Sequence, residues 1–387
     1  MYKIATLNKI SPVGLNKLTD DYKIVDELDE ANGLLLRSYD LHSTEFPADM
    51  LAIGRAGAGV NNIPLDKCAE EGIVVFNTPG ANANAVKELT IAGMFLAARN
   101  IPNGYLWASN LKEDIKKSVE KGKSQFAGSE IKGKTLGVIG LGAIGVMVAN
   151  AASELGMNVI GYDPYITVRA AHALYSTIPV VDDLGELLPQ CDFVTIHVPA
   201  NDNTKGMIDS RRIDQMKEGA VFLNFARDTL VNDKALLAAL ESGKLRNYVT
   251  DFPNDEVLGK IGVIALPHLG ASTAEAEDNC AVMAAEQLMA YIERGEIRNS
   301  VNYPACSLGA LNKDATARIC ILNKNVPSML GKITGIMADL NINIRDMTNT
   351  SKGDYAATLL DVDGDVDEAQ LREALDIEGI TRVRVIK

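Results

Sequence analysis

One stretch of the chain, KTLGVIGLGAIGVMVANAASELGMNVIGYD at residues 134–163, constrains the fold more than any other. It carries the pattern G-x-G-x-x-G at Gly140, Gly142 and Gly145, directly after a strand-like apolar run and directly before a helix-like run. In that context the first glycine permits a tight turn, the second lets the backbone approach a pyrophosphate, and the third allows close helix packing. The stretch therefore predicts a dinucleotide-binding α/β unit.

The residues around this loop indicate which dinucleotide is bound. Ala143 and Ile144 open the predicted helix, whose N-terminal amides and positive dipole suit a phosphate group. Asp163 ends the next strand-like run, where a carboxylate accepts hydrogen bonds from the adenosine ribose and repels a 2′-phosphate. The pattern therefore predicts NAD as the cofactor. We assign three later residues to the cofactor site as well. They are Asp251, His197 and Pro199, of which His197 ends a strand near the expected nicotinamide pocket and has a structural role as the alternative.

Alternation of apolar and helix-like runs predicts the fold class, which is α/β with two doubly wound parallel sheets. The first unit contains the strand-like runs YKIATL, NGLLLRS, LAIGRAG and IVVFNTP, and a helix-like run follows at 83–100. The second unit contains KTLGVIG, NVIGYD, FVTIHVP, AVFLNFA, NYVTDFP and GVIALPH. Six parallel strands are the size of a nucleotide-binding sheet, so the second unit is the expected NAD-binding domain.

The last seventy or so residues have a different order of strand-like and helix-like runs. ARICILN, INIRDMTN, YAATLLDVD and GITRVRVIK read as strands, and PSMLGKITGIMADL and VDEAQLREAL read as helices. The first of these helices is expected to place Leu330, Ile333, Met337 and Leu340 on one face. The order βαββαβ predicts a small ferredoxin-like domain, separate from the two α/β units.

These patterns predict a discontinuous first domain, because the long helix-like run after residue 273 leads back from the last strand of the second unit. The expected substrate-binding domain comprises residues 1–98 and 284–303. The expected NAD-binding domain comprises 99–283, and a linker at 304–315 leads to a regulatory domain at 316–387.

Composition excludes several classes of partner and site. The net charge of −13 and the isoelectric point near 4.9 argue against nucleic acid and anionic membranes as partners. The start, MYKIATLNKI, lacks the apolar core of a signal peptide, and no apolar run has the length of a membrane span. The cysteines form no CxxC pair, so we expect no metal site, no disulfide framework and a reducing cytoplasm. They are Cys68, Cys191, Cys280, Cys306 and Cys320.

Hydride transfer to a nicotinamide needs a group that takes the alcohol proton, a partner that tunes it, and a cation for the substrate oxygen and carboxylate. Candidates follow three late strands: Arg227 ends FLNFAR, Glu256 follows TDFPND, and His268 ends IALPH. These positions lie at the edge where open α/β sheets bind ligands. The sequence therefore predicts a catalytic set of these three residues.

The motifs VIGLGAIG, FLNFARD, DFPNDE and LPHLGAST resemble those of the D-isomer-specific 2-hydroxyacid dehydrogenases. The resemblance implies His268 as the acid/base, Glu256 as its partner and Arg227 as the substrate-polarising cation. Aligning on the Phe-Pro pair selects Asp255 as the partner instead. The chain also has Asp228 where the family usually has glycine, and an asparagine, Asn232, where it has aspartate.

In the first domain, GRAGAGVNNI combines Arg55 with glycine-freed amides around Ala56 and Gly57, which suits a carboxylate or phosphate, and Asn77 can add donors. This run and FNTPGANANAVKEL are similar to the branch of the family that oxidises D-3-phosphoglycerate to 3-phosphohydroxypyruvate, the first step of L-serine biosynthesis. That resemblance implies a phosphorylated 2-hydroxy acid as substrate. Alternatives are a hydroxypyruvate or glyoxylate reductase and an NAD(H)-sensing corepressor-like protein.

The C-terminal domain resembles ACT regulatory domains. The resemblance implies L-serine as an effector, bound between two copies by Asn325 and Asn343, and it implies a homodimer or homotetramer. The chain departs from that pattern with Asn323 where a histidine is found and with Ser328 where glycine follows the proline. The alternative is a domain of this fold that only holds subunits together.

Overall fold

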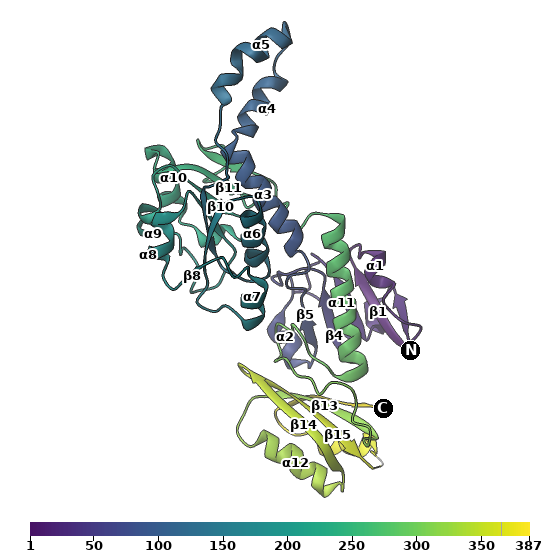
Figure 1. Ribbon diagram of the computed structural model, residues 1–387. Coiled ribbons are helices and arrows are strands. Elements are labelled where there is room, and N and C mark those ends of the chain that lie inside the picture. The colour runs from purple at the N-terminus through teal and green to yellow at the C-terminus, as the bar shows by residue number, and fades with distance from the viewer. Residues whose placement is uncertain (365) are drawn as a thin grey trace. The chain divides into compact units, whose positions relative to one another are not determined.

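The computed structural model describes residues 1–364 and 366–387, which form two compact units (Figure 1). One unit comprises Met1–Ala81 and Glu277–Lys387, and the other comprises Asn82–Ala276. The first contains a parallel and an antiparallel sheet, and the second contains a larger parallel sheet. This confirms the predicted fold class. The domain boundaries expected from the sequence remain a prediction.

The unit of residues 82–276 is built on a parallel sheet in the order β12-β11-β10-β9-β6-β7-β8. All six predicted strands are present, and a two-residue strand, β8, extends one edge. A strand of two residues has no periodicity that a sequence pattern could reveal. The bounds are β6 Thr135–Ile139, β7 Asn158–Tyr162, β8 Val180–Val181, β9 Phe193–Ile196, β10 Ala220–Asn224, β11 Leu245–Thr250 and β12 Val263–Ala265.

Helices cover this sheet on apolar faces. α6 packs closely because its buried side is made of small residues, among them Ala149 and Ala152. α3 adds Val86 and Met94 to the same apolar cluster. The bounds are α3 Ala83–Ala98, α6 Ala143–Glu154, α7 Val168–Ala173, α8 Leu184–Leu187, α9 Ser210–Gln215 and α10 Asp233–Ser242, with 3₁₀ turns η3 Leu188–Gln190 and η4 Asp228–Leu230.

A helical arm leaves the same unit between α3 and β6. It consists of α4 Ile101–Ser109, α5 Ile115–Gly122 and the 3₁₀ turn η2 Lys123–Phe126, and Figure 1 shows α4 and α5 standing away from the sheet. Trp107 and Phe126 pack with ring centroids 5.2 Å apart, yet neither helix has a buried residue. Apolar side chains such as Tyr105 are therefore left exposed on the arm.

The other unit contains a parallel sheet in the order β2-β1-β3-β4-β5. The four predicted strands are present, and β2 was not predicted. α11 packs on this sheet through alanines, and a Cβ on Gly54 would lie only 3.2 Å from the Ala284 carbonyl oxygen. The bounds are β1 Tyr2–Leu7, β2 Tyr22–Val25, β3 Gly33–Leu36, β4 Ala52–Arg55, β5 Val74–Phe76, α1 Pro12–Leu15, η1 Leu28–Glu30, α2 Leu65–Glu70 and α11 Ala274–Arg294.

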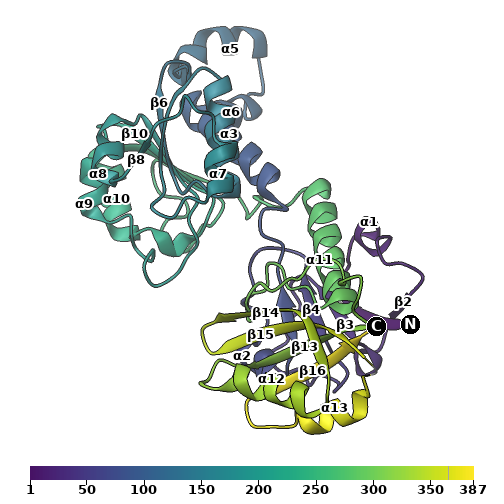
Figure 2. The same cartoon turned by 60° about the horizontal axis from the view of Figure 1, so that its bottom comes forward.

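The C-terminal residues form the predicted βαββαβ domain, with an antiparallel sheet in the order β14-β15-β13-β16. Figure 2 shows α12 and α13 on one face of this sheet. Alternate residues of β13 point to opposite faces: Ile319 and Ile321 pack with α12, while Cys320 and Leu322 pack with α11. The bounds are β13 Ala317–Lys324, α12 Met329–Asp339, β14 Asn343–Lys352, β15 Tyr355–Asp363, α13 Glu368–Ala374 and β16 Ile380–Ile386.

The buried face of α12 differs in one position from the expected one. Ile333 and Met337 are fully buried as expected, but Leu330 is 39% exposed and Met329 takes its place in the core. The prediction for Leu330 was therefore wrong. Met329, Ile333 and Met337 repeat every four residues and form the buried row of α12. Leu330 lies about 100° around the helix from Met329, at the edge of that row.

Arginines fasten the C-terminal sheet to the end of α11. Arg384 lies over the Tyr291 ring at 4.9 Å and donates to the Tyr291 carbonyl at 3.0 Å. Arg318 is buried, forms a two-pronged ion pair with Asp361 and donates to the Arg294 carbonyl at 3.2 Å. The carbonyls at a helix C-terminus carry partial negative charge, so cations are favoured there. These contacts join the C-terminal domain to the five-stranded domain of the same unit.

No helix within 1–364 and 366–387 is both long and apolar enough to cross a bilayer. In the same residues, no group of three or more His, Cys, Asp or Glu side chains is placed to hold a metal ion.

Candidate active site

The predicted dinucleotide loop lies where the order of strands reverses. β6 pairs with β7 on one side and with β9 on the other, so successive connections leave β6 in opposite directions. Hydrogen bonds connect the start of the loop to the ends of both neighbouring strands. The Gly140 N–H donates to the Tyr162 carbonyl at 2.8 Å, and the His197 N–H donates to the Ile139 carbonyl at 2.7 Å. Open α/β sheets bind ligands beyond the carboxyl ends of their strands at such a reversal.

Each of the three glycines of the loop is required, or is suited to its place, for a different geometric reason. Gly140 has φ +91°, a left-handed conformation that side chains rarely adopt. A Cβ on Gly145 would lie 1.8 Å from the Gly140 carbonyl oxygen, so only glycine lets α6 pass this closely. A Cβ on Gly142 would meet nothing within 4 Å, so the backbone at the start of α6 faces open space. That space and the helix amides fit a pyrophosphate.

Asp163 braces the same loop. Its two carboxylate oxygens accept hydrogen bonds of 2.8 Å from the backbone amides of Leu141 and Tyr165. Each carboxylate oxygen has a second lone pair, so the half-buried group retains the capacity to accept from ribose hydroxyls. The position therefore fits the predicted role.

His197 presents an uncharged ring beside the loop. Its Nε2 lies 3.0 Å from the Thr195 hydroxyl, and burial lowers the pKa of the imidazole to about 3, so the ring is neutral at physiological pH. Its Nδ1 is buried and has no hydrogen-bond partner within the described residues. A buried polar atom without a partner is costly, so this atom is suited to meet a bound group. Pro199 is exposed two residues later.

Arg227 follows β10 and is placed by a buried amide. The Asn224 side chain accepts from the N–H groups of Ala226 and Arg227 at 3.1 and 3.3 Å and donates to the Arg227 carbonyl at 2.8 Å. It also donates to the Tyr248 hydroxyl at 3.1 Å. The exposed Arg227 guanidinium donates from Nη1 to the Ala226 carbonyl at 2.6 Å. The backbone that presents this cation is therefore fixed from the sheet interior.

Asp251 follows β11 and is fully buried. Oδ2 accepts from the Gly270 N–H at 2.7 Å, and Oδ1 has no partner among the described residues. Burial raises the pKa of this carboxyl, and the Gly270 bond and the charges of His268 and Arg227 oppose that rise. The carboxyl is thus electrostatically coupled to both predicted catalytic side chains.

Phe252 connects the same two side chains by direct contact. The Arg227 guanidinium lies 5.2 Å from the centre of its ring, and the His268 ring centroid lies 4.4 Å from it at an interplanar angle of 47°. Both contacts are of the kind that orients cations and imidazoles on aromatic rings. The structure therefore brings Arg227 and His268 to one aromatic side chain, and His268 itself is exposed.

The predicted partner of His268 forms no hydrogen bond or ion pair with it among the described residues. Glu256 and the alternative Asp255 are exposed, and within residues 1–364 and 366–387 neither carboxylate forms a hydrogen bond or ion pair with His268. The backbone N–H of Glu256 donates to Asn254 Oδ1 at 3.1 Å. The assignment of Glu256 stays a prediction.

Two residues of this arrangement were missed by sequence reasoning, Asn224 and Phe252. The available signal was positional, because each lies at the carboxyl end of a predicted strand, within three residues of a candidate side chain. Asn232 has a local role: it caps α10 by accepting from the Ala235 N–H at 3.0 Å. Asp228 opens η4, and no ion pair links it to Arg227 in the described structure.

In the first-domain loop of residues 55–58, the Arg55 side chain packs against Gly57. Arg55 Nε donates to the Arg37 carbonyl at 3.1 Å, and a Cβ on Gly57 would lie 1.7 Å from Arg55 Nη1. Gly57 has φ +149°. Asn77 Nδ2 donates to the Ala58 carbonyl at 2.7 Å, and Ala56 is buried. The guanidinium thus occupies the space that a side chain at position 57 would fill.

The two predicted effector residues lie at opposite ends of the C-terminal sheet. Asn325 follows Lys324, which pairs with Tyr355 on β15, whereas Asn343 pairs with Asp363. Eight residues of β15 separate these ends, about 27 Å at 3.4 Å per residue. One copy of the domain therefore cannot join both asparagines to one small ligand.

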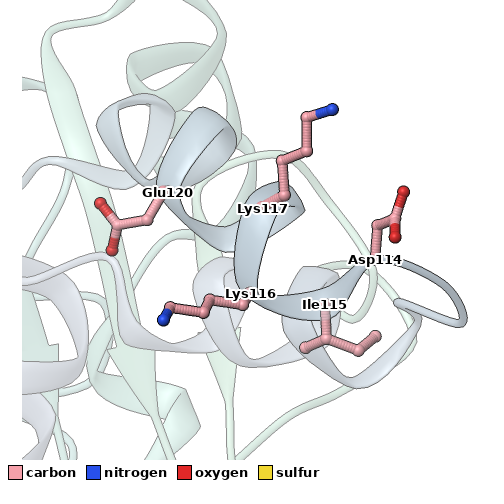
Figure 3. Close-up of a pocket in the computed structure, with 5 residues that line it drawn as sticks. All are labelled: Asp114, Ile115, Lys116, Lys117 and Glu120. Carbon is pink, nitrogen blue, oxygen red and sulfur yellow. The ribbon is translucent and has the colours of Figure 1, made fainter.

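A hollow of about 470 Å³ lies on the helical arm, lined by Asp114, Ile115, Lys116, Lys117 and Glu120 (Figure 3). The figure shows these side chains spreading outward from α5 in different directions. None of the residues predicted for the active site lines it. The hollow is therefore a feature of the arm surface and is distinct from the candidate active site.

Comparison with known proteins agrees with this arrangement. Residues 91–272 match the model of the D-isomer specific 2-hydroxyacid dehydrogenase, NAD binding domain. The D-3-phosphoglycerate dehydrogenase of Methanocaldococcus jannaschii is 39% identical over 306 residues, 75% of this chain and 56% of that protein. The enzyme of the same name from Haemophilus influenzae is 33% identical over 348 residues, 87% of this chain and 81% of that protein.

A solved structure extends the likeness to three dimensions. The NAD⁺-bound 3-phosphoglycerate dehydrogenase of Entamoeba histolytica is 26% identical, with a TM-score of 0.61, over 78% of this chain and 98% of that one. This chain spans little more than half the length of the Methanocaldococcus relative. With a dinucleotide loop at the strand reversal and these relatives across most of its length, the chain belongs to the D-isomer specific 2-hydroxyacid dehydrogenase family.

Proposed function

We propose that the chain oxidises D-3-phosphoglycerate to 3-phosphohydroxypyruvate with NAD, the first step of L-serine biosynthesis. The observation that carries the proposal is the meeting of Arg227 and His268 on the Phe252 ring, with the buried Asp251 coupled to both. All four residues follow neighbouring strands β10, β11 and β12 of the NAD-binding sheet. The names of the two sequence relatives support the choice of substrate.

The cofactor would be held by the glycine loop. The α6 amides behind Gly142 would bind the pyrophosphate, Asp163 would accept from the adenosine ribose, and His197 Nδ1 would meet a polar group of the nicotinamide half. When bound, the nicotinamide ring supplies the acceptor for the hydride that leaves the substrate carbon.

His268 would take the proton of the substrate hydroxyl on its imidazole as the C–H bond breaks, and would return it in reduction. Arg227 would bind the substrate carboxylate and the reacting oxygen, since its donors are fixed by the Asn224-held backbone. Glu256 would stabilise the protonated imidazole, with Asp255 as the alternative. The negative charge of an ionised Asp251 would act in the same direction.

The phosphate or carboxylate of the substrate would be recognised by the loop of residues 55–58. Arg55, the amides around Ala56 and Gly57, and the Asn77 side chain supply donors of the kind that bind anions. A phosphate requirement would distinguish this substrate from glyoxylate and hydroxypyruvate. No phosphate-specific contact is needed for the chemistry itself.

We also propose an effector, an oligomeric state and a cellular location for the chain. L-Serine would bind between two C-terminal domains, because Asn325 and Asn343 can approach one ligand only if two copies contribute one each. The exposed apolar side chains of α4 and α5 support a homodimer or homotetramer. All five cysteines are free and buried, which agrees with a reducing cytoplasm.

A single assay tests the proposed reaction. Purified protein is given NAD and, in turn, D-3-phosphoglycerate, D-glycerate, glycolate and D-lactate, and NADH is followed by absorbance. Preference in kcat/KM for the phosphorylated acid supports the proposal. Preference for an unphosphorylated acid instead supports a hydroxypyruvate or glyoxylate reductase, and NADH binding without turnover of any acid supports a corepressor-like protein.

A further inference from the structure

The loop of residues 55–58 is held partly by residues outside it. Its last two carbonyls accept hydrogen bonds from the segment after β5: Asn77 Nδ2 donates to Ala58 at 2.7 Å, and the Thr78 N–H donates to Gly57 at 3.1 Å. The conformation of this loop therefore depends on the position of residues 77 and 78.

Asn77 is in turn held by α11 and by the chain that follows it. Gln287, only 7% exposed, donates from Nε2 to the Asn77 carbonyl at 2.9 Å. Asn299 donates from Nδ2 to Gln287 Oε1 at 2.7 Å, and its carbonyl accepts from the Asn77 N–H at 3.4 Å. Gln287 thus uses both ends of its amide, so a change at Asn299 is transmitted to Asn77 through a buried group.

The chain after Asn299 is bound on one side to β5. Phe76 and Ser300 form an antiparallel bridge, and Asn302 accepts from the Val75 N–H at 2.9 Å and donates to the Ile73 carbonyl at 2.8 Å. On the other side it is bound to the C-terminal domain. Lys352 donates from Nζ to the carbonyls of Ser300 and Val301, both at 3.2 Å.

Lys352 ends β14 at the turn that also contacts Asn325. The Asn325 N–H donates to the Asp354 carbonyl at 2.8 Å, and Asn325 Nδ2 donates to the Gly353 carbonyl at 3.1 Å. Hydrogen bonds and the backbone between them therefore connect Asn325, through the turn at 352–354 and Lys352, to the segment at 299–302. From there the connection passes through Gln287 and Asn77 to the loop of residues 55–58.

We propose that Lys352 and Gln287 are positioning residues for the loop of residues 55–58, so that the C-terminal domain sets the affinity of the chain for its anionic substrate. Neither residue would contact substrate or take part in hydride transfer. The inference rests on the proposed function in one respect, namely that this loop binds the substrate anion. It makes the turn at 352–354 the place where an occupant of the C-terminal domain would change substrate binding.

Steady-state rates of the full-length protein test the proposal, with NAD saturating and D-3-phosphoglycerate varied. Lys352→Met and Gln287→Leu should each raise KM by about three- to tenfold, the range that coupling residues typically produce, while kcat changes by less than about twofold. Lys352→Arg retains a donor and should restore KM. Lys332→Met is the matched control, because Lys332 is an exposed lysine of the same domain on α12, outside this set of bonds.

Hydrogen exchange provides a readout that does not depend on turnover. Amides of residues 56–58 and 77–78 should exchange several-fold faster in Lys352→Met and Gln287→Leu than in the wild type or Lys332→Met. Unchanged exchange in both variants overturns the inference, and so does a fall in kcat with KM unchanged. If the wild type does not oxidise D-3-phosphoglycerate, the proposed function fails, and the exchange data alone decide whether these residues position the loop.

Discussion

The buried carboxyl of Asp251 accepts a hydrogen bond of 2.7 Å from the backbone N–H of Gly270. Gly270 comes two residues after His268, so this bond ties the segment that carries the predicted acid/base to the end of β11. The other oxygen of Asp251 has no partner among the described residues. The carboxyl therefore holds the site together while carrying a desolvation cost whenever it is ionised.

That cost predicts a pH dependence of stability. Burial raises the pKa of Asp251 in the folded chain, so the folded state favours the protonated form. The stabilisation from protonation is complete below the unfolded pKa of about 3.9 and is lost as pH rises through the higher folded pKa. Asp251→Asn cannot ionise and keeps an acceptor for the Gly270 N–H. Its stability relative to the wild type should therefore increase from about pH 4 to about pH 7.

Urea unfolding of both proteins across that range measures the difference. Asp202→Asn, at an exposed aspartate of the same unit, is the control for the substitution itself. A relative stability that falls as pH rises would contradict the interpretation.

Replacing Asn224 should destabilise the unit of residues 82–276. Asn224→Leu leaves the backbone groups of Ala226 and Arg227 without their partner, and unsatisfied buried groups cost about 1–3 kcal/mol each. We expect the free energy of unfolding to fall by about 2–4 kcal/mol, as measured by urea denaturation. A loss of less than about 0.5 kcal/mol, the range of ordinary surface changes, would show that the hydrogen bonds of Asn224 contribute little to stability.

His268→Ala should lower kcat by about 10²–10⁴-fold, the usual contribution of a general acid/base. NADH binding, followed by fluorescence, should stay nearly unchanged, because the His268 ring contacts Phe252 and is not part of the glycine loop that is proposed to hold the cofactor. His172→Ala, at an exposed histidine of α7, is the control and should keep wild-type rates. Wild-type turnover of His268→Ala at neutral pH would refute the assignment.

Asp163→Ser should narrow the preference for NAD over NADP. The serine removes the charge that repels a 2′-phosphate but keeps an acceptor near the Leu141 N–H. The measurement is the ratio of kcat/KM for the two cofactors, with Asp182→Ser at an exposed aspartate as control. Equal values of kcat/KM for NAD and NADP in the wild type would contradict the predicted role of Asp163.

Ser328→Gly should stabilise the C-terminal domain. Ser328 has φ +68° at the start of α12, and its side chain makes no capping hydrogen bond. Relief of the left-handed strain should raise the free energy of unfolding by about 0.5–1 kcal/mol. Ser351→Gly, in the extended strand β14, should instead lower it by a similar amount, and the two midpoints of thermal unfolding compare them directly. Destabilisation by Ser328→Gly would show that the site is unstrained.

Local patterns in the sequence were sufficient for the parts of the protein that depend on near neighbours in the chain. The turn after β6, the start of α6 and the placement of Asp163 follow from glycine spacing and strand length, because the strand, turn and helix involved are consecutive. The edge that carries Arg227 and His268 was predictable for a similar reason, since parallel strands end on one side of a sheet. The βαββαβ order of the last domain also followed from periodicity.

Tertiary structure alone decided which side chains meet across those elements. Phe252 contacts both Arg227 and His268, and the buried Asp251 accepts from the Gly270 N–H. These contacts form because the segments that follow β10, β11 and β12 meet at one edge of the sheet. Strand register placed Asn325 and Asn343 at opposite ends of one sheet, a separation that spacing in the chain does not reveal. The burial of a side chain, its hydrogen-bond partners and its pKa depend on groups far away in the sequence, and no local pattern contains them.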